Sequence, residues 1–167
     1  QNIEERYSSR WLPPASGMRE YIHSLRAIFH AFRTGTPLAF VGEHYRFTRL
    51  QPFFNPGPID APDVPLALGA VGPRMLALVG ECADGIHTHP SNTSPRYLRE
   101  AIVPVVNEGM LSRDPGLAQP FIAANVLVAM GADDAGVATE RERFRGVLAF
   151  LFSTPAYWPS LRLFGWE

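Results

Sequence analysis

This sequence of 167 residues contains a single cysteine, no long apolar run and no excess of positive charge. Its single cysteine, Cys82, allows no disulfide within the chain, and we expect this residue to be a small apolar core side chain. No signal peptide and no apolar run of about 18 residues is present, so we expect a soluble, cytoplasmic protein with no membrane partner. The formal net charge of -1 argues against a nucleic-acid groove, which needs a clustered basic face.

Several familiar motifs are also missing. No Gly-x-Ser-x-Gly elbow is present, and a lone cysteine inside a predicted helix is a poor nucleophile candidate. The turn Gly69-Ala70-Val71-Gly72 lacks the Gly-x-Gly-x-x-Gly spacing and the following lysine of the common nucleotide loops. An anion at this turn would therefore be held neither in the Rossmann manner nor in the P-loop manner.

The composition is that of an ordinary globular protein, with 46% hydrophobic and 19% charged residues. The length suits one domain with a sizeable core, so we expect a single domain over residues 1–167. The first residue is glutamine rather than methionine, which hints that the natural polypeptide starts earlier.

Residues 64–89 have the pattern of strand, glycine-bearing turn, helix and strand. The apolar run 64–68 predicts a strand buried on both faces, and Pro73 predicts the start of a helix that extends to about Ala83. Asp84-Gly85 then turns the chain into a second strand over residues 86–89. Together these elements predict one βαβ unit.

The start of the predicted helix is a candidate anion site. Free N–H groups and the positive end of the helix dipole attract anions there. Arg74, in the first turn, is at the unfavourable end for a cation unless an anion is bound as well. We therefore predict that the turn from Gly69 to Gly72 holds a phosphate, although a purely structural strand-to-helix turn has the same pattern.

The segments before this unit predict a helix, a hairpin and a loop. Helical spacing of apolar residues follows the N-cap candidate Ser16 and stops at Gly35, with polar residues such as Glu20 solvated on the other side. Residues 38–50 have the pattern of a small hairpin. Five of the sixteen prolines fall within residues 51–65, which predicts an extended surface loop.

The segments after it continue the alternation of strand and helix. Ser94-Pro95 predicts the start of a helix kinked at Pro104, and residues 121–130 predict a third strand. Asp133 is expected to cap the next helix, and Thr154-Pro155 to start a short aromatic one. This order predicts an α/β fold with a parallel sheet and outer helices. A piece of a (β/α)8 barrel, which takes about 250 residues when complete, and a small doubly wound sheet both fit the length.

Ligands of either architecture bind at the carboxyl ends of the strands. The sequence predicts those ends at residues 69–72, 88–92 and 129–133. Strand alternation places His87 and His89 on one face and Thr88 on the other. His89 could face substrate as a hydrogen-bond donor, acid or base, or it could simply be satisfied by a neighbouring carbonyl.

The His-x-His spacing of His87 and His89 also suits two ligands of one metal, as in metal-dependent hydrolases built on barrels. That alternative needs further ligands from other strand ends, where only Asp133 and Asp134 are present. Because these two aspartates have the pattern of helix-capping residues, the metal alternative is the weaker hypothesis, and we expect no metal.

The segment PLALGAVGPRMLALVGECADGIHTHPSNTSPRYLREAIVP resembles the luciferase-like monooxygenase superfamily, especially its coenzyme F-420 (deazaflavin)-dependent oxidoreductases. The motifs are Gly72-Pro73-Arg74-Met75 and Gly80-Glu81-Cys82-Ala83-Asp84-Gly85, after a strand that ends in a small-residue turn. The runs REYIHSLRAIF, FVGEHYRF and STPAYWPSLRLFGW are similar to segments of the same group.

This resemblance implies a TIM barrel that transfers a hydride between a deazaflavin, or FMN as second choice, and a small organic substrate. The turn matching Gly69, Ala70, Val71 and Gly72 contacts the cofactor phosphate through its backbone in such proteins, with Arg74 beside it. The strand end matching Thr88 and His89 faces the cofactor and substrate pocket. The resemblance thus makes Thr88 a candidate cofactor contact and His89 the candidate catalytic residue.

The resemblance also implies that the chain is a fragment, the middle-to-late part of a barrel. The first strands would precede Gln1, and the last strand and helix would follow Glu167. An exposed sheet edge would favour aggregation or association, and a homodimer is possible for the full-length form. We expect the 167 residues alone to be inactive. A further alternative is a non-catalytic flavin-binding relative.

Overall fold

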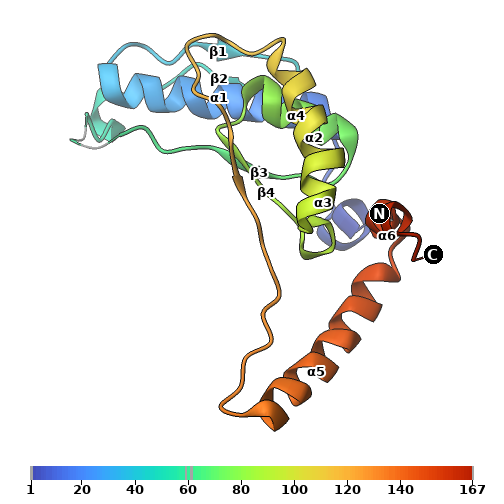
Figure 1. Cartoon of the computed structure of the whole chain (residues 1–167). Coiled ribbons are helices and arrows are strands. Elements are labelled where there is room, and N and C mark those ends of the chain that lie inside the picture. The colour runs from blue at the N-terminus through green and yellow to red at the C-terminus, as the bar shows by residue number, and fades with distance from the viewer. Residues whose placement is uncertain (1, 59, 61, 167) are drawn as a thin grey trace. The chain divides into compact units, whose positions relative to one another are not determined.

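A computed structural model describes residues 2–58, 60 and 62–166 of the chain (Figure 1). The chain divides into two compact units, Gln1–Leu66 and Ala67–Glu167. The first unit carries a long helix and a small hairpin, and the second carries the parallel sheet.

The first unit is built on helix α1, Pro14–Thr34, which follows a short π-helical turn, η1, at Asn2–Arg6. The prediction of an N-cap at Ser16 is wrong, because Pro14 begins the helix from a position where its missing N–H costs nothing. The helix ends where the sequence predicts. Gly35 adopts a left-handed conformation, φ 71°, and its N–H donates to the carbonyl of Ala31 at 3.0 Å.

The predicted hairpin is confirmed as antiparallel strands β1, Phe40–Val41, and β2, Arg46–Phe47. Its turn is held by Glu20 of α1, whose carboxylate accepts the backbone N–H groups of Glu43 at 3.0 Å, His44 at 2.8 Å and Tyr45. The prediction that Glu20 is solvated is therefore wrong. A Cβ at Gly42 would clash with this carboxylate, so a larger residue there would displace the Glu20 side chain from the turn.

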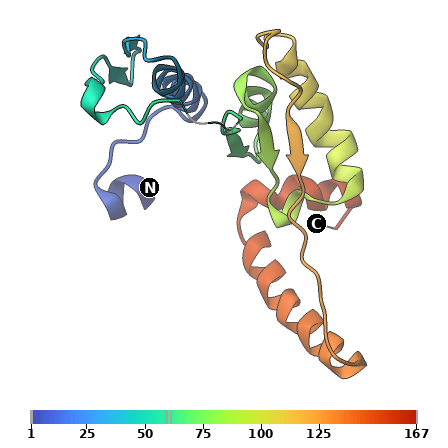
Figure 2. The same ribbon diagram turned by 90° about the vertical axis from the view of Figure 1, so that its left-hand side faces the viewer.

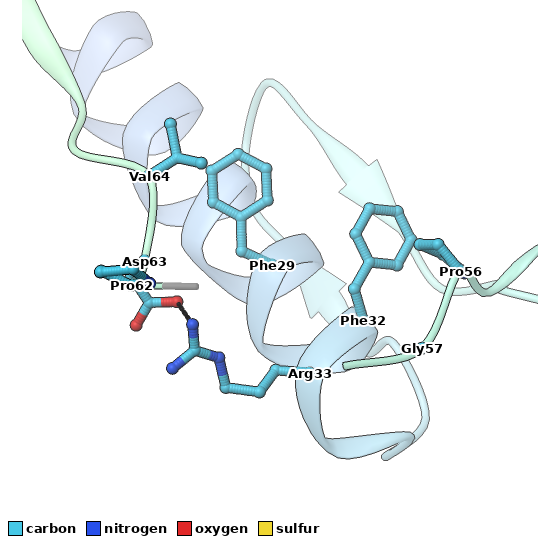
Figure 3. Close-up of a pocket in the computed structure, with 8 residues that line it drawn as sticks. All are labelled: Phe29, Phe32, Arg33, Pro56, Gly57, Pro62, Asp63 and Val64. Atoms are coloured by element: carbon cyan, nitrogen blue, oxygen red, sulfur yellow. Dashed lines mark ion pairs between the residues drawn. The ribbon is translucent and has the colours of Figure 1, made fainter. Parts of the chain in front are cut away.

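The predicted surface loop over residues 51–65 is extended and mostly exposed in its described part, apart from a 3-10 turn, η2, at Pro52–Phe54. Residues 59 and 61 of this prediction lie outside the described residues. Asn55 anchors the loop to α1 by donating from Nδ2 to the carbonyl of Ala31 at 3.3 Å. A pocket of about 110 Å³ lies between loop and helix, with Phe29 and Phe32 on one side (Figure 3).

The second unit contains three parallel strands in the order β3-β4-β5: Ala67–Gly69, Gly85–His87 and Phe121–Ala123. Leu68 pairs with Ile86, and Ile86 pairs with Ile122. Helix α2, Pro73–Cys82, connects the first two strands, which confirms the predicted βαβ unit. Figure 2 shows β4 (green) and β5 (orange) running side by side in the same direction.

A helical segment in three parts connects β4 to β5: α3 at Pro95–Tyr97, a π-helical turn, η4, at Leu98–Ile102, and α4 at Val103–Met110. Ser94 caps its start as predicted, because its Oγ accepts the N–H of Tyr97 at 3.2 Å. The sequence predicts a kink at Pro104, and the structure has the π-helical turn η4 just before this proline. Proline offers no N–H and its ring crowds the preceding turn, so the helix widens there.

The core of the second unit lies where α2 packs on α4. Leu76, Leu78, Val79 and Cys82 of α2 are buried, which confirms Cys82 as a core residue. The backbones meet closely at two glycines. A Cβ at Gly80 would clash with the carbonyl of Val106, and one at Gly109 would clash with the carbonyl of Ala77.

The third predicted strand, residues 121–130, is too long. Only Phe121–Ala123 pairs with β4, and the apolar residues 126–128 are extended and exposed. Strand β4 itself ends at His87, and Thr88, the residue after it, is linked to Asn125 through side-chain hydrogen bonds instead of continuing the ladder. The predicted strand end at residues 129–133 is therefore wrong, and the strand ends at Ala123. Strand β3 likewise begins at Ala67 rather than at Val64, because its partner strand β4 begins at Gly85.

The last helices follow the sequence closely. Helix α5, Asp134–Phe152, is capped by Asp133, whose Oδ1 accepts the N–H of Gly136 at 2.8 Å. A 3-10 turn, η5, at Pro155–Tyr157 leads into α6, Trp158–Phe164, which ends at Gly165 with φ 67°. Within the described ranges, no helix combines the length and the apolar composition that crossing a bilayer requires.

Candidate functional site

The carboxyl edge of the parallel sheet is where the candidate site residues meet. Gly69, His87 and Ala123 end the three strands and lie level with one another in the register. Residues 69–72, 87–92 and 123–127 therefore leave the sheet at one edge. Open parallel sheets and barrels bind their ligands at this edge.

The turn after β3 leaves open space in front of α2. Gly72 is the N-cap of α2, and its carbonyl accepts the N–H groups of Met75 at 3.1 Å and Leu76 at 3.0 Å. The N–H groups of Gly72 and Arg74 form no hydrogen bond with the described residues. A Cβ at Gly69 or Gly72 would meet nothing within 4 Å, and neither glycine has a positive φ. These glycines therefore keep space free beside unsatisfied donors, an arrangement that fits a phosphate.

The other residues predicted at this turn differ in exposure. Ala70 is 3% exposed, so only its main chain is available to a ligand, and Val71 is half-buried. Arg74 is exposed, and within the described chain it forms no ion pair or hydrogen bond through its side chain. Its guanidinium is therefore free to approach an anion at the start of α2. Cofactor binding by these residues stays a prediction.

Thr88 ties β4 to the chain after β5. Its side chain is buried, its N–H donates to the carbonyl of Ala123 at 3.0 Å, and its Oγ1 accepts the N–H of Asn125 at 3.2 Å. The Nδ2 group of Asn125 donates to the Thr88 carbonyl at 2.8 Å. Sequence reasoning missed Asn125 because it lies inside the predicted third strand. A lone asparagine in that apolar run was the available signal.

His89 is held by the two residues that follow it. The N–H of Ser91 donates to Nδ1 of His89 at 3.3 Å, and Oγ of Ser91 lies 2.8 Å from the same atom. Both contacts are made by Nδ1, so Nε2 is the ring nitrogen that has no hydrogen bond to the described residues. Oγ of Ser91 also donates to Oδ1 of Asn92 at 3.0 Å. Nδ2 of Asn92, a buried donor, has no partner among the described residues.

Tyr157 fixes the orientation of the His89 ring. The two rings stack with centroids 4.2 Å apart and planes 2° from parallel. Tyr157 belongs to η5, so the carboxyl end of β4 and the chain between α5 and α6 meet at this histidine. Sequence reasoning did not identify this contact, although Tyr157 lies in the run STPAYW that carried part of the resemblance.

A metal held by His87 and His89 would need further ligands nearby, and the described residues provide no such group. His87 is exposed and packs edge-to-face on Phe121, with ring centroids 6.3 Å apart. No group of three or more His, Cys, Asp or Glu side chains that could hold a metal occurs in the part of the chain that the structure describes. Asp133 caps α5 instead of facing the strand ends.

A pocket of about 390 Å³ lies between the segments after β4 and β5 and helices α5 and α6, and His89 is not among the residues that line it. Pro90 and Ser91 line it where they follow His89. Its volume is within the range of about 300–1,000 Å³ that is usual for small-molecule sites. Its large apolar side chains are Val126, Leu127, Leu148, Phe152, Leu161, Phe164 and Trp166.

Comparison with known proteins identifies the family. The model of the family described as luciferase-like monooxygenase matches residues 1–167. The uncharacterized protein Rv1360 of Mycobacterium tuberculosis is 40% identical over 165 residues, which make up 99% of this chain and 48% of that protein. The chain therefore spans about half the length of this relative.

Two enzymes are more distant relatives. The 5,10-methylenetetrahydromethanopterin reductase of Methanopyrus kandleri is 28% identical over 121 residues, 72% of this chain and 32% of that protein. The F420-dependent glucose-6-phosphate dehydrogenase of Nakamurella multipartita is 31% identical over 83 residues, 50% of this chain and 23% of that protein.

The family match confirms the predicted fold class. The three parallel strands and connecting helices of residues 67–123 form an α/β fold that is consistent with part of a (β/α)8 barrel. The motifs around α2 that carried the resemblance lie at its start and at the turn into β4. The chain belongs to the luciferase-like monooxygenase family.

Proposed function

We propose that this chain supplies the phosphate-binding turn and part of the substrate pocket of an oxidoreductase. The enzyme transfers a hydride between coenzyme F-420, a deazaflavin, and a small organic substrate, with FMN as the second choice of cofactor. Family membership and the F420 dependence named for the Nakamurella relative support this proposal. The observation that carries it is the open turn Gly69–Gly72 at the start of α2.

The cofactor phosphate would be held by main-chain donors at this turn. The N–H groups of Gly72 and Arg74 and the positive end of the α2 dipole all favour an anion at the helix start. Pro73, between them, has no N–H and sets the backbone angle of the first turn. The guanidinium of Arg74 repels the helix dipole when nothing is bound, and a phosphate converts this unfavourable position into a favourable one.

The bound deazaflavin would supply the hydride chemistry, while the chain supplies position and electrostatics. His89 is the residue we propose for proton transfer or hydrogen bonding to the substrate, through Nε2. Stacking on Tyr157 and the Ser91 contacts to Nδ1 hold this ring in one orientation. Nδ2 of Asn92 offers a further buried donor at the same edge.

The first test of this proposal is cofactor binding by the complete natural protein with Gly72→Asp. A carboxylate at the helix start should repel the cofactor phosphate and weaken F-420 binding about tenfold, or about 1.4 kcal/mol. Tryptophan quenching by F-420 and by FMN measures the two dissociation constants. Gly146→Asp is the matched control, because it adds the same charge at a glycine of α5 where a Cβ also meets open space.

Four results bear on the proposal in different ways. Weaker binding in Gly72→Asp but not in Gly146→Asp supports it. Equal binding by both variants and the unaltered protein would show that the phosphate lies elsewhere. If neither F-420 nor FMN binds the unaltered protein, the proposal fails as a whole. Binding without oxidation or reduction of any substrate would favour a non-catalytic relative.

A further inference from the structure

We infer that a groove between helix α1 and the loop that follows the hairpin binds a small anion with a flat apolar body, such as an aromatic carboxylate. The groove is lined by residues between positions 26 and 64, all of which belong to the first unit. The inference therefore goes beyond the proposed function and does not depend on it. It is carried by a cationic pocket that adjoins an apolar one.

Two pockets adjoin along one side of α1. The pocket of about 110 Å³ described above and a second pocket of about 250 Å³ are both lined by Phe29, Arg33, Asp63 and Val64. Figure 3 shows the phenyl ring of Phe29 facing Val64 and the guanidinium of Arg33 facing Asp63. Because these four residues are shared, the two pockets form one groove with two chemically different ends.

The apolar end of the groove is built from flat side chains. Phe29 and Phe32 are three residues apart, so they lie on the same face of α1, and both are half-buried. Pro56 and Pro62 of the loop form the opposite wall. A flat ring between these walls would exchange water for contact with rings on both sides, which favours binding.

The other end of the groove is cationic. Arg26, His30 and Arg33 follow one another at spacings of four and three residues, which places them on one face of α1. Among the described residues that line this pocket, two are arginines and one, Asp63, is an acid. A guanidinium presents a planar fork that matches a carboxylate, and His30 adds a ring N–H donor. This end therefore suits the anionic group of the ligand.

Asp63 occupies the position that the ligand carboxylate would take. Its Oδ1 lies 2.5 Å from Nη2 of Arg33, and its side chain is 71% exposed. An ion pair this exposed contributes little net stability, so a ligand can replace Asp63, which then returns to water. Asn55 keeps the loop in place, because its Nδ2 donates to the carbonyl of Ala31 at 3.3 Å and its Oδ1 accepts the N–H of Gly57 at 2.8 Å.

The experiment titrates the complete natural protein with three probes and measures binding by isothermal titration calorimetry. The first probe, 2-naphthoate, has both the rings and the charge. The second, 2-naphthamide, has the same rings without the charge, and the third, acetate, has the charge without the rings. We expect 2-naphthoate to bind at least tenfold more tightly than either, because only this probe can occupy both ends of the groove.

Two matched pairs of variants locate the ligand. Arg33→Gln should weaken 2-naphthoate binding about tenfold, because a charge-assisted hydrogen bond is lost. Asp63→Asn should strengthen it about threefold, because the competing carboxylate is gone. Arg10→Gln and Asp60→Asn make the same charge changes at exposed positions that are not among the described lining residues, and they should change neither. If Arg33→Gln does not fold, the comparison of Asp63→Asn with Asp60→Asn still decides.

Several results would overturn the inference. One is equal affinity for 2-naphthoate and 2-naphthamide, since the cationic end would then contribute nothing. Another is binding of 2-naphthoate that neither Arg33→Gln nor Asp63→Asn changes. Binding that Gly72→Asp weakens while Arg33→Gln leaves it unchanged would place the ligand at the start of α2 instead. Absence of 2-naphthoate binding to the unaltered protein would also refute it.

Discussion

At the scale of single residues, the structure gives two side chains partners that lie far away in the sequence. Glu20 of α1 accepts the N–H groups of the hairpin turn, and His89 stacks on Tyr157. Main-chain N–H donors hold the Glu20 carboxylate, and the aromatic ring of Tyr157 holds the His89 imidazole. Glu20 thereby stabilises the first unit, and His89 is positioned for the proposed reaction in the second.

Glu20 makes the stability of the first unit depend on pH. Partial desolvation acts to raise the pKa of this carboxyl, but the N–H groups of Tyr45, His44 and Glu43 and the charge of His44 outweigh it, so the pKa is lowered. A carboxyl with a lowered folded-state pKa contributes stability above its unfolded-state pKa. That contribution is lost as the pH falls through the lowered, folded-state pKa.

Glu20→Gln tests this dependence. The amide keeps one acceptor oxygen but loses the charge that favours the three N–H contacts. We expect a lower unfolding temperature than wild type at pH 7 and a smaller difference between the two proteins under acid conditions. Thermal unfolding followed by circular dichroism measures both. Glu5→Gln, at an exposed position of η1, is the control, and an equal pH dependence of wild type and Glu20→Gln would contradict the prediction.

At the scale of secondary-structure elements, the contact between α2 and α4 fixes the start of α2 relative to the sheet. Gly80 and Gly109 let the two backbones touch, and the buried side chains around them form the core of the second unit. The position of the proposed phosphate site therefore depends on a contact at the opposite end of α2 from Gly72.

Gly109→Ala should destabilise the second unit, although alanine favours helices. The added Cβ would clash with the carbonyl of Ala77, and forced overpacking of this kind costs about 1–3 kcal/mol. Gly146→Ala, on exposed α5, should instead stabilise by up to about 1 kcal/mol, because its Cβ meets open space. Urea unfolding of the two variants measures the difference. Equal effects of the two substitutions would show that the backbones do not approach closely.

At the scale of the whole molecule, the second unit leaves much apolar surface uncovered. Phe121, Ile122, Val126, Val128 and Met130 are all exposed, along or just beyond the edge strand β5. No residue of α5 is buried in the structure as described. Edge strands and apolar surfaces of this kind favour pairing with another chain.

The chain of 167 residues should therefore self-associate in solution. Light scattering over a range of protein concentrations should give a mass that rises with concentration. Val128→Lys should reduce this association, because a lysine next to an edge strand opposes pairing. Leu111→Lys, at an exposed position outside this surface, should leave it unchanged. A monomeric mass at all concentrations would contradict the prediction.

The sequence by itself determined the features that depend on neighbouring residues. The helix ends at Gly35 and Gly165, the caps at Ser94 and Asp133, and the βαβ unit around Pro73 were all predictable, as were the family and its fold class. Caps, turns and periodicity are set within a few residues of chain, so the local sequence contains the information that specifies them.

Only the tertiary structure decided what depends on distant residues. The third strand spans only Phe121–Ala123 instead of the predicted residues 121–130, because its regular pairing with β4 ends at His87. The contacts of Glu20, the link from Thr88 to Asn125 and the stack of His89 on Tyr157 join segments that no local pattern connects. A hydrogen bond or ring stack between such segments exists only once packing has brought them together, and the pocket between α5, α6 and the segments after β4 and β5 is formed in the same way.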